Sequence, residues 1–125
     1  MKLESLLPSV QKMPLKHPVS GEETGIEFNL VGQDSKPFRD KARAISKGMI
    51  GKKTQDLDPI AIEAESFELV AACIVGWNDE EAFGPYTPSR AVELMKMDEL
   101  AFAREQIEEF VKLRANFFRK LGEAA

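Results

Sequence analysis

Apolar and polar residues alternate near the start of the chain, and this alternation predicts a small sheet. Within residues 26–30, isoleucine, phenylalanine and leucine are separated by polar side chains, which is the pattern of a strand with one buried face. Residues 12–16 can pair with this strand across the turn-rich stretch 18–22, although Pro14 confines them to a sheet edge. We therefore expect a β-hairpin over residues 11–32.

From residue 35 onward the apolar period changes to about 3.6 residues, which predicts helices. Three of these helices begin with a capping side chain that is followed by proline. The three signals are Ser35 with Pro37, Asp58 with Pro59, and Thr87 with Pro88. The second helix is expected to reach about Trp77. Asp98 and Glu99 start a fourth helix, which we expect to continue through Leu121 and to close at Gly122.

These elements predict an α+β fold that is mainly α. A small N-terminal β-hairpin is followed by a bundle of about four helices over residues 35–122, and residues 1–10 are expected to form a flexible arm. The length of 125 residues suits a single domain over residues 1–125. A chain of this size buries enough surface to form one core without disulfide bonds or a metal.

Charge and composition narrow the function classes. The chain carries 21 acidic and 17 basic residues, and the resulting net charge of −4 repels a phosphate backbone, so nucleic acid is not an expected partner. The single Cys73 lies among apolar residues and is interpreted as a core residue in a reducing compartment. The sequence has no apolar run long enough to span a bilayer and no signal-peptide pattern at its start. We expect a cytoplasmic protein with no membrane partner.

The sequence contains no recognisable pattern of catalytic or ligand-binding residues. His17, the only histidine, lies in a predicted turn, and no serine or cysteine motif suggests a nucleophile for it. Phosphate-binding glycine loops and zinc-binding motifs are missing. The carboxylates of residues 78–81 do not follow the order of a calcium loop and are interpreted as a solvated loop. We therefore expect a protein that is not an enzyme and that needs no metal or cofactor.

The only tryptophan and the only tyrosine of the chain flank this acidic loop. On helical spacing, Trp77 ends the inward-facing row of the second helix, which begins with Ile60 and Phe67. Tyr86 precedes the predicted cap Thr87, a position from which an apolar residue packs onto the first turns of the following helix. Both aromatic residues are therefore expected to pack in the core.

Three stretches of the chain form a longer pattern. LKHPVSGEETGIEFNLVGQDS has a proline-and-glycine turn, then Gly-Ile and an apolar strand that ends in a glycine and Asp-Ser. IVGWNDEEAFGPYTPSRAVELM has Gly-Trp, an acidic loop and an aromatic residue before Thr-Pro, and REQIEEFVKLRANFFRKLGEAA has Gln-Ile and Asn-Phe-Phe in the closing helix. In this order, from about residue 13 to residue 121, they resemble the tail assembly chaperones of long-tailed, siphovirus-like bacteriophages and prophages.

The resemblance implies a role without catalysis. Proteins of this family are made in the host bacterial cytoplasm, coat the tape-measure protein to keep it soluble, help recruit the major tail protein, and are absent from the mature virion. Trp77, Tyr86, Pro88 and Phe117 fall on the matched motifs and are expected to be structural. The alternative is a small structural phage protein, such as a head–tail connector or tail completion protein, which would copurify with virions.

Both long predicted helices carry apolar residues on two sides. On helical spacing, Phe102 and Leu113 lie outside the main stripe of the fourth helix, and Ile62 and Leu69 lie opposite the inward row of the second. A helix of this kind is either packed on both sides within a bundle or contacts a partner. These four residues are the candidate surface for binding the tape-measure protein, or for self-association.

Two charged residues fall within the predicted apolar stripes. Glu63 lies in that of the second helix and Arg114 in that of the fourth. A buried charge needs a partner, so we expect either a direct pair between them or a separate partner for each. Alternatively, Glu63 stays in water at the start of its helix and Arg114 extends its head group to solvent.

Overall fold

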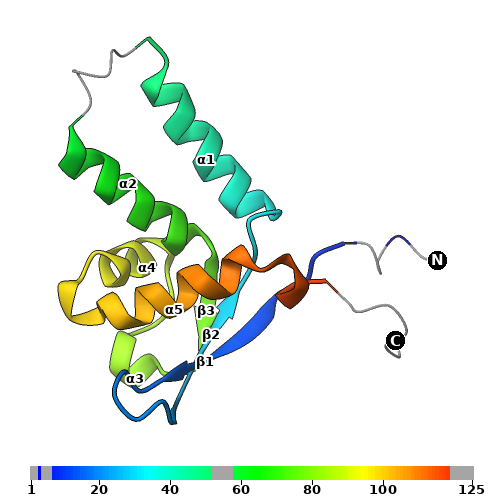
Figure 1. Ribbon diagram of the computed structural model, residues 1–125, viewed down its shortest axis with the longest axis vertical. Helices are drawn as coiled ribbons and strands as arrows, with labels where there is room; N and C mark the ends of the chain where they lie inside the picture. The colour runs from blue at the N-terminus through cyan, green and yellow to red at the C-terminus, as the bar shows by residue number, and fades with distance from the viewer. Residues whose placement is uncertain (1–2, 4–6, 52–57, 119–125) are drawn as a thin grey trace.

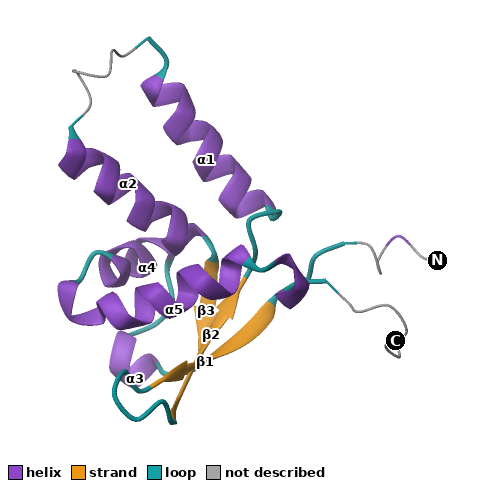
Figure 2. Ribbon diagram, in the orientation of Figure 1, coloured by secondary structure: helices purple, strands orange, loops and turns teal. Residues whose placement is uncertain are grey.

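The computed structural model describes residue 3, residues 7–51 and residues 58–118. The fold is α+β and mainly α, as the sequence predicted, with a small sheet and a set of helices (Figures 1 and 2). The strands are β1 (Gln11–Lys16), β2 (Glu23–Leu30) and β3 (Ile74–Trp77). The helices are α1 (Lys36–Met49), α2 (Pro59–Ala72), α3 (Glu80–Phe83), α4 (Pro88–Met95) and α5 (Ala101–Lys112), with 3-10 turns at Asp98–Leu100 and Arg114–Asn116.

The sheet has the order β1-β2-β3, and both pairs of strands are antiparallel. The predicted hairpin is confirmed, and Met13 lies opposite Phe28 in its register. Met13, Leu15 and Phe28 are buried on one face of the sheet, whereas Lys12 and Lys16 are exposed. Antiparallel sheets commonly pack one face against a core and leave the other to solvent, and this sheet follows that rule.

The third strand corrects the prediction that the second helix reaches Trp77. α2 ends at Ala72, and the chain turns at Cys73 before β3 pairs with β2, so that Trp77 lies opposite Phe28. A four-residue apolar run cannot be assigned to a helix or a strand from periodicity alone. Here the open edge of β2 determines the outcome, because its backbone groups need partners.

The helices form two groups in space. α4 and α5 lie close against the sheet, whereas α1 and the N-terminal part of α2 project away from it as a pair (Figure 1). α2 contacts α1, α4 and α5, so its two apolar sides are explained in part by packing within the molecule. Its first turn is not covered in this way, because Ile60 is 79% exposed. The prediction that Ile60 belongs to the inward row is therefore wrong.

The three predicted capping signals are confirmed as helix starts. The side chains of Ser35, Asp58 and Thr87 accept hydrogen bonds from backbone N–H groups in the first turns of α1, α2 and α4. The donor–acceptor distance is 3.0 Å both for Asp58 and for Thr87. Each cap thus satisfies a backbone donor that the helix itself leaves without a partner.

The fourth predicted helix is shorter than expected. Asp98 and Glu99 form a 3-10 turn, α5 begins at Ala101, and it ends at Lys112. Phe117 follows in a second 3-10 turn region rather than on the helix, and the predicted end at residues 121–122 lies outside the described residues.

The predicted arm is held to the body of the protein at its C-terminal end. The backbone N–H of Ser9 donates to the Phe117 carbonyl at 2.8 Å, and the Ser9 hydroxyl lies 3.3 Å from the same oxygen. The expectation of a flexible arm over residues 1–10 is therefore wrong at this position. Residues 1–2 and 4–6 lie outside the described part of the chain.

Trp77 and Tyr86 are packing residues, as predicted, although Trp77 lies on a strand. The Trp77 ring packs edge-on against Phe83 and Tyr86, and its indole N–H donates to the Gly84 carbonyl at 2.8 Å. The Tyr86 hydroxyl donates to the Ile74 carbonyl at 2.8 Å. Residues 78–81 are largely exposed to solvent, as expected, but they are not entirely a loop, because the short helix α3 begins at Glu80 and buries Phe83.

Candidate interaction surface

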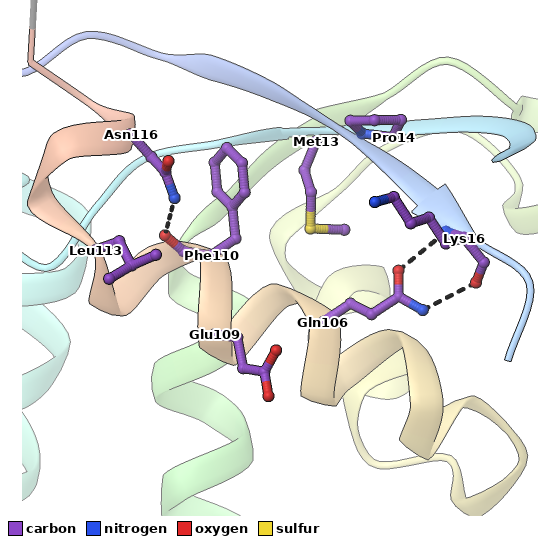
Figure 3. Close-up of a pocket in the computed structure, with 8 residues that line it drawn as sticks. All are labelled: Met13, Pro14, Lys16, Gln106, Glu109, Phe110, Leu113 and Asn116. Carbon is purple, nitrogen blue, oxygen red and sulfur yellow. Dashed lines mark hydrogen bonds between the residues drawn. The ribbon is translucent and has the colours of Figure 1, made fainter. Parts of the chain in front are cut away.

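An apolar groove of about 460 Å³ runs between β1 and α5 (Figure 3). Segments from both ends of the chain form it, since β1 provides one wall and α5 with the following 3-10 turn provides the other. Its lining residues are Met13, Pro14, Lys16, Gln106, Glu109, Phe110, Leu113 and Asn116. The described residues thus form a concave apolar surface with a few polar groups at its margin, which is the usual character of a binding site.

The end of α5 determines how the groove is exposed. Leu113 follows the last helical residue with an extended backbone and is 60% exposed. The Asn116 side-chain amide donates to the Phe110 carbonyl at 2.8 Å and thereby satisfies one acceptor at the end of the helix. Phe110 itself packs edge-on against buried Phe117, with ring centroids 5.4 Å apart. Leu113 is therefore an accessible apolar side chain beside a firmly held aromatic one.

Gln106 links α5 to the edge of β1. Its side-chain oxygen accepts from the Lys16 backbone N–H at 2.9 Å, and its side-chain nitrogen donates to the Lys16 carbonyl at 2.8 Å (Figure 3). An amide that bonds to both backbone groups of one residue takes the place of a neighbouring strand. Two residues earlier, Pro14 has no N–H to offer. Together these features protect the edge of β1 from pairing with another chain.

We expect Gln106→Ala to lower the free energy of unfolding by about 1–2 kcal/mol, because two hydrogen bonds to an edge strand are lost at a site that water still reaches. Urea unfolding monitored by Trp77 fluorescence measures the change. Gln106→Glu is the matched comparison, since it keeps an acceptor for the Lys16 N–H but places a charge beside the Lys16 carbonyl. If both variants unfold like the parent protein, the amide does not stabilise this edge.

The structure separates the four residues that the sequence proposed for partner binding. Leu113 lines the groove and is 60% exposed, and Ile62 on α2 is 41% exposed. Phe102 is partly buried and packs against the core, and Leu69 on α2 is also partly buried. Leu113 is the only one of the four in the groove. The sequence pattern did not identify Met13 and Pro14, which also line the groove. The apolar pattern of a helix carries no information on which strand lies beside it.

The predicted pair of Glu63 with Arg114 does not form. Arg114 makes two hydrogen bonds to Asp34, with Nε–Oδ2 and Nη2–Oδ1 distances of 2.8 Å and 3.0 Å, while Glu63 is exposed near the start of α2. The reason is that α5 ends before Arg114, so helical spacing no longer places its side chain. The hydrogen bond from Arg114 and the further charge of Arg39 lower the pKa of Asp34.

Arg104, unlike Arg114, bonds to neighbouring helices. Its Nη1 donates to the Met95 carbonyl at the end of α4 at 2.7 Å, and its guanidinium carbon lies 3.9 Å from the centre of the Phe67 ring on α2. A guanidinium satisfies a carbonyl at a helix end and stacks on an aromatic ring at the same time. Arg104 thus connects α5 with α4 and α2.

The residues of the matched motifs occupy structural positions. Trp77 and Phe117 are buried, at 7% and 1% exposure. Tyr86 is partly buried, and Pro88 lies exposed at the first position of α4. Tyr86 and Pro88 also border a second hollow of about 500 Å³ between α1, α2 and α4, where Glu68 lies 3.6 Å from both Lys41 and Lys96.

Two further side chains with potentially reactive groups are His17 and Cys73. His17 lies in the β1–β2 turn and its Nδ1 accepts from the backbone N–H groups of Val19 and Ser20. Cys73 is fully buried, and this burial raises the pKa of its thiol to about 12. Within residues 7–51 and 58–118, no group of three or more histidine, cysteine or acidic side chains could hold a metal ion. None of the described helices has both the length and the apolar character needed to cross a membrane.

A comparison of the chain with protein-family models, with curated proteins and with solved structures found no match. The resemblance therefore rests on its three sequence stretches. The first covers the β1–β2 turn and β2, the second runs from β3 through α4, and the third begins in α5 beside the groove.

Proposed function

We propose that this chain is a tail assembly chaperone of a long-tailed phage or prophage, which binds the tape-measure protein, keeps it soluble and helps to recruit the major tail protein. In this proposal it acts in the host cytoplasm by binding alone, without a catalytic step, and does not remain in the mature virion. The sequence resemblance supports the family. The exposure of Leu113 beside an apolar groove is the structural observation that supports a binding role.

The groove suits an apolar side chain presented by a partner helix. Met13 and Phe110 provide an apolar lining, and Leu113 adds accessible apolar surface at its margin. Amphipathic helices commonly bind by placing such anchors in a hydrophobic groove. Lys16 and Glu109 at the same groove carry charges that remain hydrated and would keep the complex soluble. A long helical client that aggregates on its own would be shielded in this way.

The Leu113→Ser variant tests binding of the tape-measure protein separately from the folding stability of this chain. Because Leu113 is already 60% exposed, we expect its replacement to change the free energy of unfolding by no more than about 0.5 kcal/mol. Loss of an anchor in an interface typically costs about 2 kcal/mol, which is roughly a 30-fold weaker complex. We therefore expect a normally folded variant that leaves coexpressed tape-measure protein in the insoluble fraction. Thermal unfolding and the soluble yield of the client measure the two quantities.

Ile62→Ser is the matched control, because Ile62 is also partly exposed and lies on α2 outside the groove. Phe102→Ser is not suitable, since Phe102 packs against the core. If the client stays soluble with Leu113→Ser but precipitates with Ile62→Ser, the client binds α2 and not the groove. Detection of the protein in washed virions by mass spectrometry, in a fixed ratio to the tail proteins, would contradict the chaperone role and favour a connector or completion protein.

A further inference from the structure

The charges of this acidic protein are unevenly distributed, and α1 carries an excess of positive charge. The helix holds five basic side chains and one carboxylate, Asp40. Helical spacing places most of the basic side chains on the side opposite to its apolar residues, which are half-buried and face α2. The basic stripe, as we call it, consists of Lys36, Arg39, Arg43 and Lys47. It lies on the solvent side of the projecting helix pair.

Contacts within the molecule neutralise the basic stripe only in part. Asp40 is shared between Lys36 and Arg43, and their side chains remain 84% and 76% exposed. Arg39 lies 3.4 Å from Asp34, whose closer partner is Arg114. Lys47 has no ion pair among the described residues. The stripe therefore retains a net positive charge that faces water.

The opposite end of the molecule is acidic. Asn78 fixes the start of α3 beside β2, because its amide bonds to the Glu27 N–H at 2.8 Å and to the Gly25 carbonyl at 2.9 Å. The carboxylates that follow Asn78 therefore lie at the same end of the molecule as those beside the β1–β2 turn (Figure 1). The acidic end, defined in this way, consists of Glu22, Glu23, Asp79, Glu80 and Glu81.

Among the described residues, few cations lie near the acidic end. Lys16 is opposite Glu23 in the sheet, and Arg90 donates to the Phe83 carbonyl and pairs with Glu93 on its own helix. Figure 1 shows α1 towards one end of the long axis of the molecule, and the β1–β2 turn with α3 at the other. The basic stripe and the acidic end therefore cannot meet within one molecule.

We propose that the basic stripe of one copy of this chain docks on the acidic end of a second copy. Charge complementarity favours a second copy as the partner, because every copy carries one basic stripe and one acidic end. The contact joins two different surfaces, so it is head-to-tail and extends into a row of molecules or closes into a ring, unlike a two-fold dimer. It involves neither the groove nor Leu113, so this inference stands apart from the proposed client binding.

Sedimentation of the purified full chain over a range of protein concentrations tests the proposal. We expect association at about 20 mM NaCl that is lost at about 500 mM NaCl, where the Debye length is only about 4 Å. We expect Arg43→Glu with Lys47→Glu to weaken association at least about tenfold, and Glu80→Lys with Glu81→Lys to do the same, because each places like charges opposite one another.

Mixing the two double variants provides the decisive measurement. Each is expected to be monomeric alone, and the mixture is expected to associate again, because the reversed stripe of one matches the reversed end of the other. The control variant Glu63→Lys with Glu105→Lys changes the net charge as much as Glu80→Lys with Glu81→Lys does, but at exposed sites outside both surfaces, and it should associate at least as well as the parent protein. A parent protein that stays monomeric at low salt, or a mixture that fails to associate although both variants are folded, would overturn the proposal.

Discussion

Trp77→Ala is expected to lower the free energy of unfolding by about 3–5 kcal/mol, which is the usual cost of truncating a buried tryptophan. Trp77 is 7% exposed and lies on the short strand β3, where its ring packs against Phe28, Phe83 and Tyr86. The loss would leave a cavity where the sheet meets α3 and the loop before α4. Because domains are stabilised by only about 5–15 kcal/mol in total, we expect a large fall in the unfolding temperature.

Trp77→Phe is the matched comparison. It keeps an aromatic ring against Phe28 but removes the indole N–H that donates to the Gly84 carbonyl. We expect a loss of about 1–3 kcal/mol, from the smaller ring and from the acceptor that is left without its partner. Thermal and urea unfolding followed by circular dichroism measure both variants without relying on the tryptophan signal. A loss of less than about 1 kcal/mol for Trp77→Ala would show that the aromatic cluster contributes little to the stability of the core.

The parts of the fold that the sequence predicts are those determined by near neighbours. The alternation of residues 26–30 identifies β2, and each of Ser35, Asp58 and Thr87 caps its helix within three residues along the chain. In contrast, β3 depends on a strand more than forty residues earlier, since Phe28 pairs with Trp77. A short apolar segment next to a helix carries no local sign of such a pairing, and helical spacing was wrongly extended through it.

In the candidate site, too, some features depend on residues that are near in the sequence and others on residues that are distant. Helical spacing made Leu113 a candidate because it falls outside the apolar stripe, but its exposure arises from the extended backbone that follows the end of α5. The groove itself is formed by β1 and α5, which meet through Lys16 and Gln106 across 90 residues of sequence. The partner of Arg114 was predicted wrongly, because the helix that was expected to continue ends at Lys112. The Arg114 side chain bonds to Asp34 instead. Helical spacing places side chains only as far as the helix extends.

Phe117→Ala is expected to be about as damaging as the loss of Trp77, at about 3–5 kcal/mol. Phe117 is 1% exposed, packs edge-on against Phe110, and accepts hydrogen bonds from Ser9 through its carbonyl. It lies beyond the end of α5, so its side chain attaches the chain after the helix to the sheet. Removing the ring should loosen this segment and the residues before β1 that are bonded to it through Ser9. Urea unfolding of the purified variant measures the loss.

Gly32 reveals how tightly the Phe117 ring is held. A methyl group added at Gly32 would lie 2.8 Å from Cδ2 of Phe117, and this ring has no room to move because it is buried against Phe110. We expect Gly32→Ala to cost about 1–3 kcal/mol, as overpacking of a core typically does. In a Phe117→Leu background the same change should cost at least about 0.5 kcal/mol less, because residues in contact are not additive. Equal costs in both backgrounds would show that the Phe117 ring does not determine what residue 32 can be.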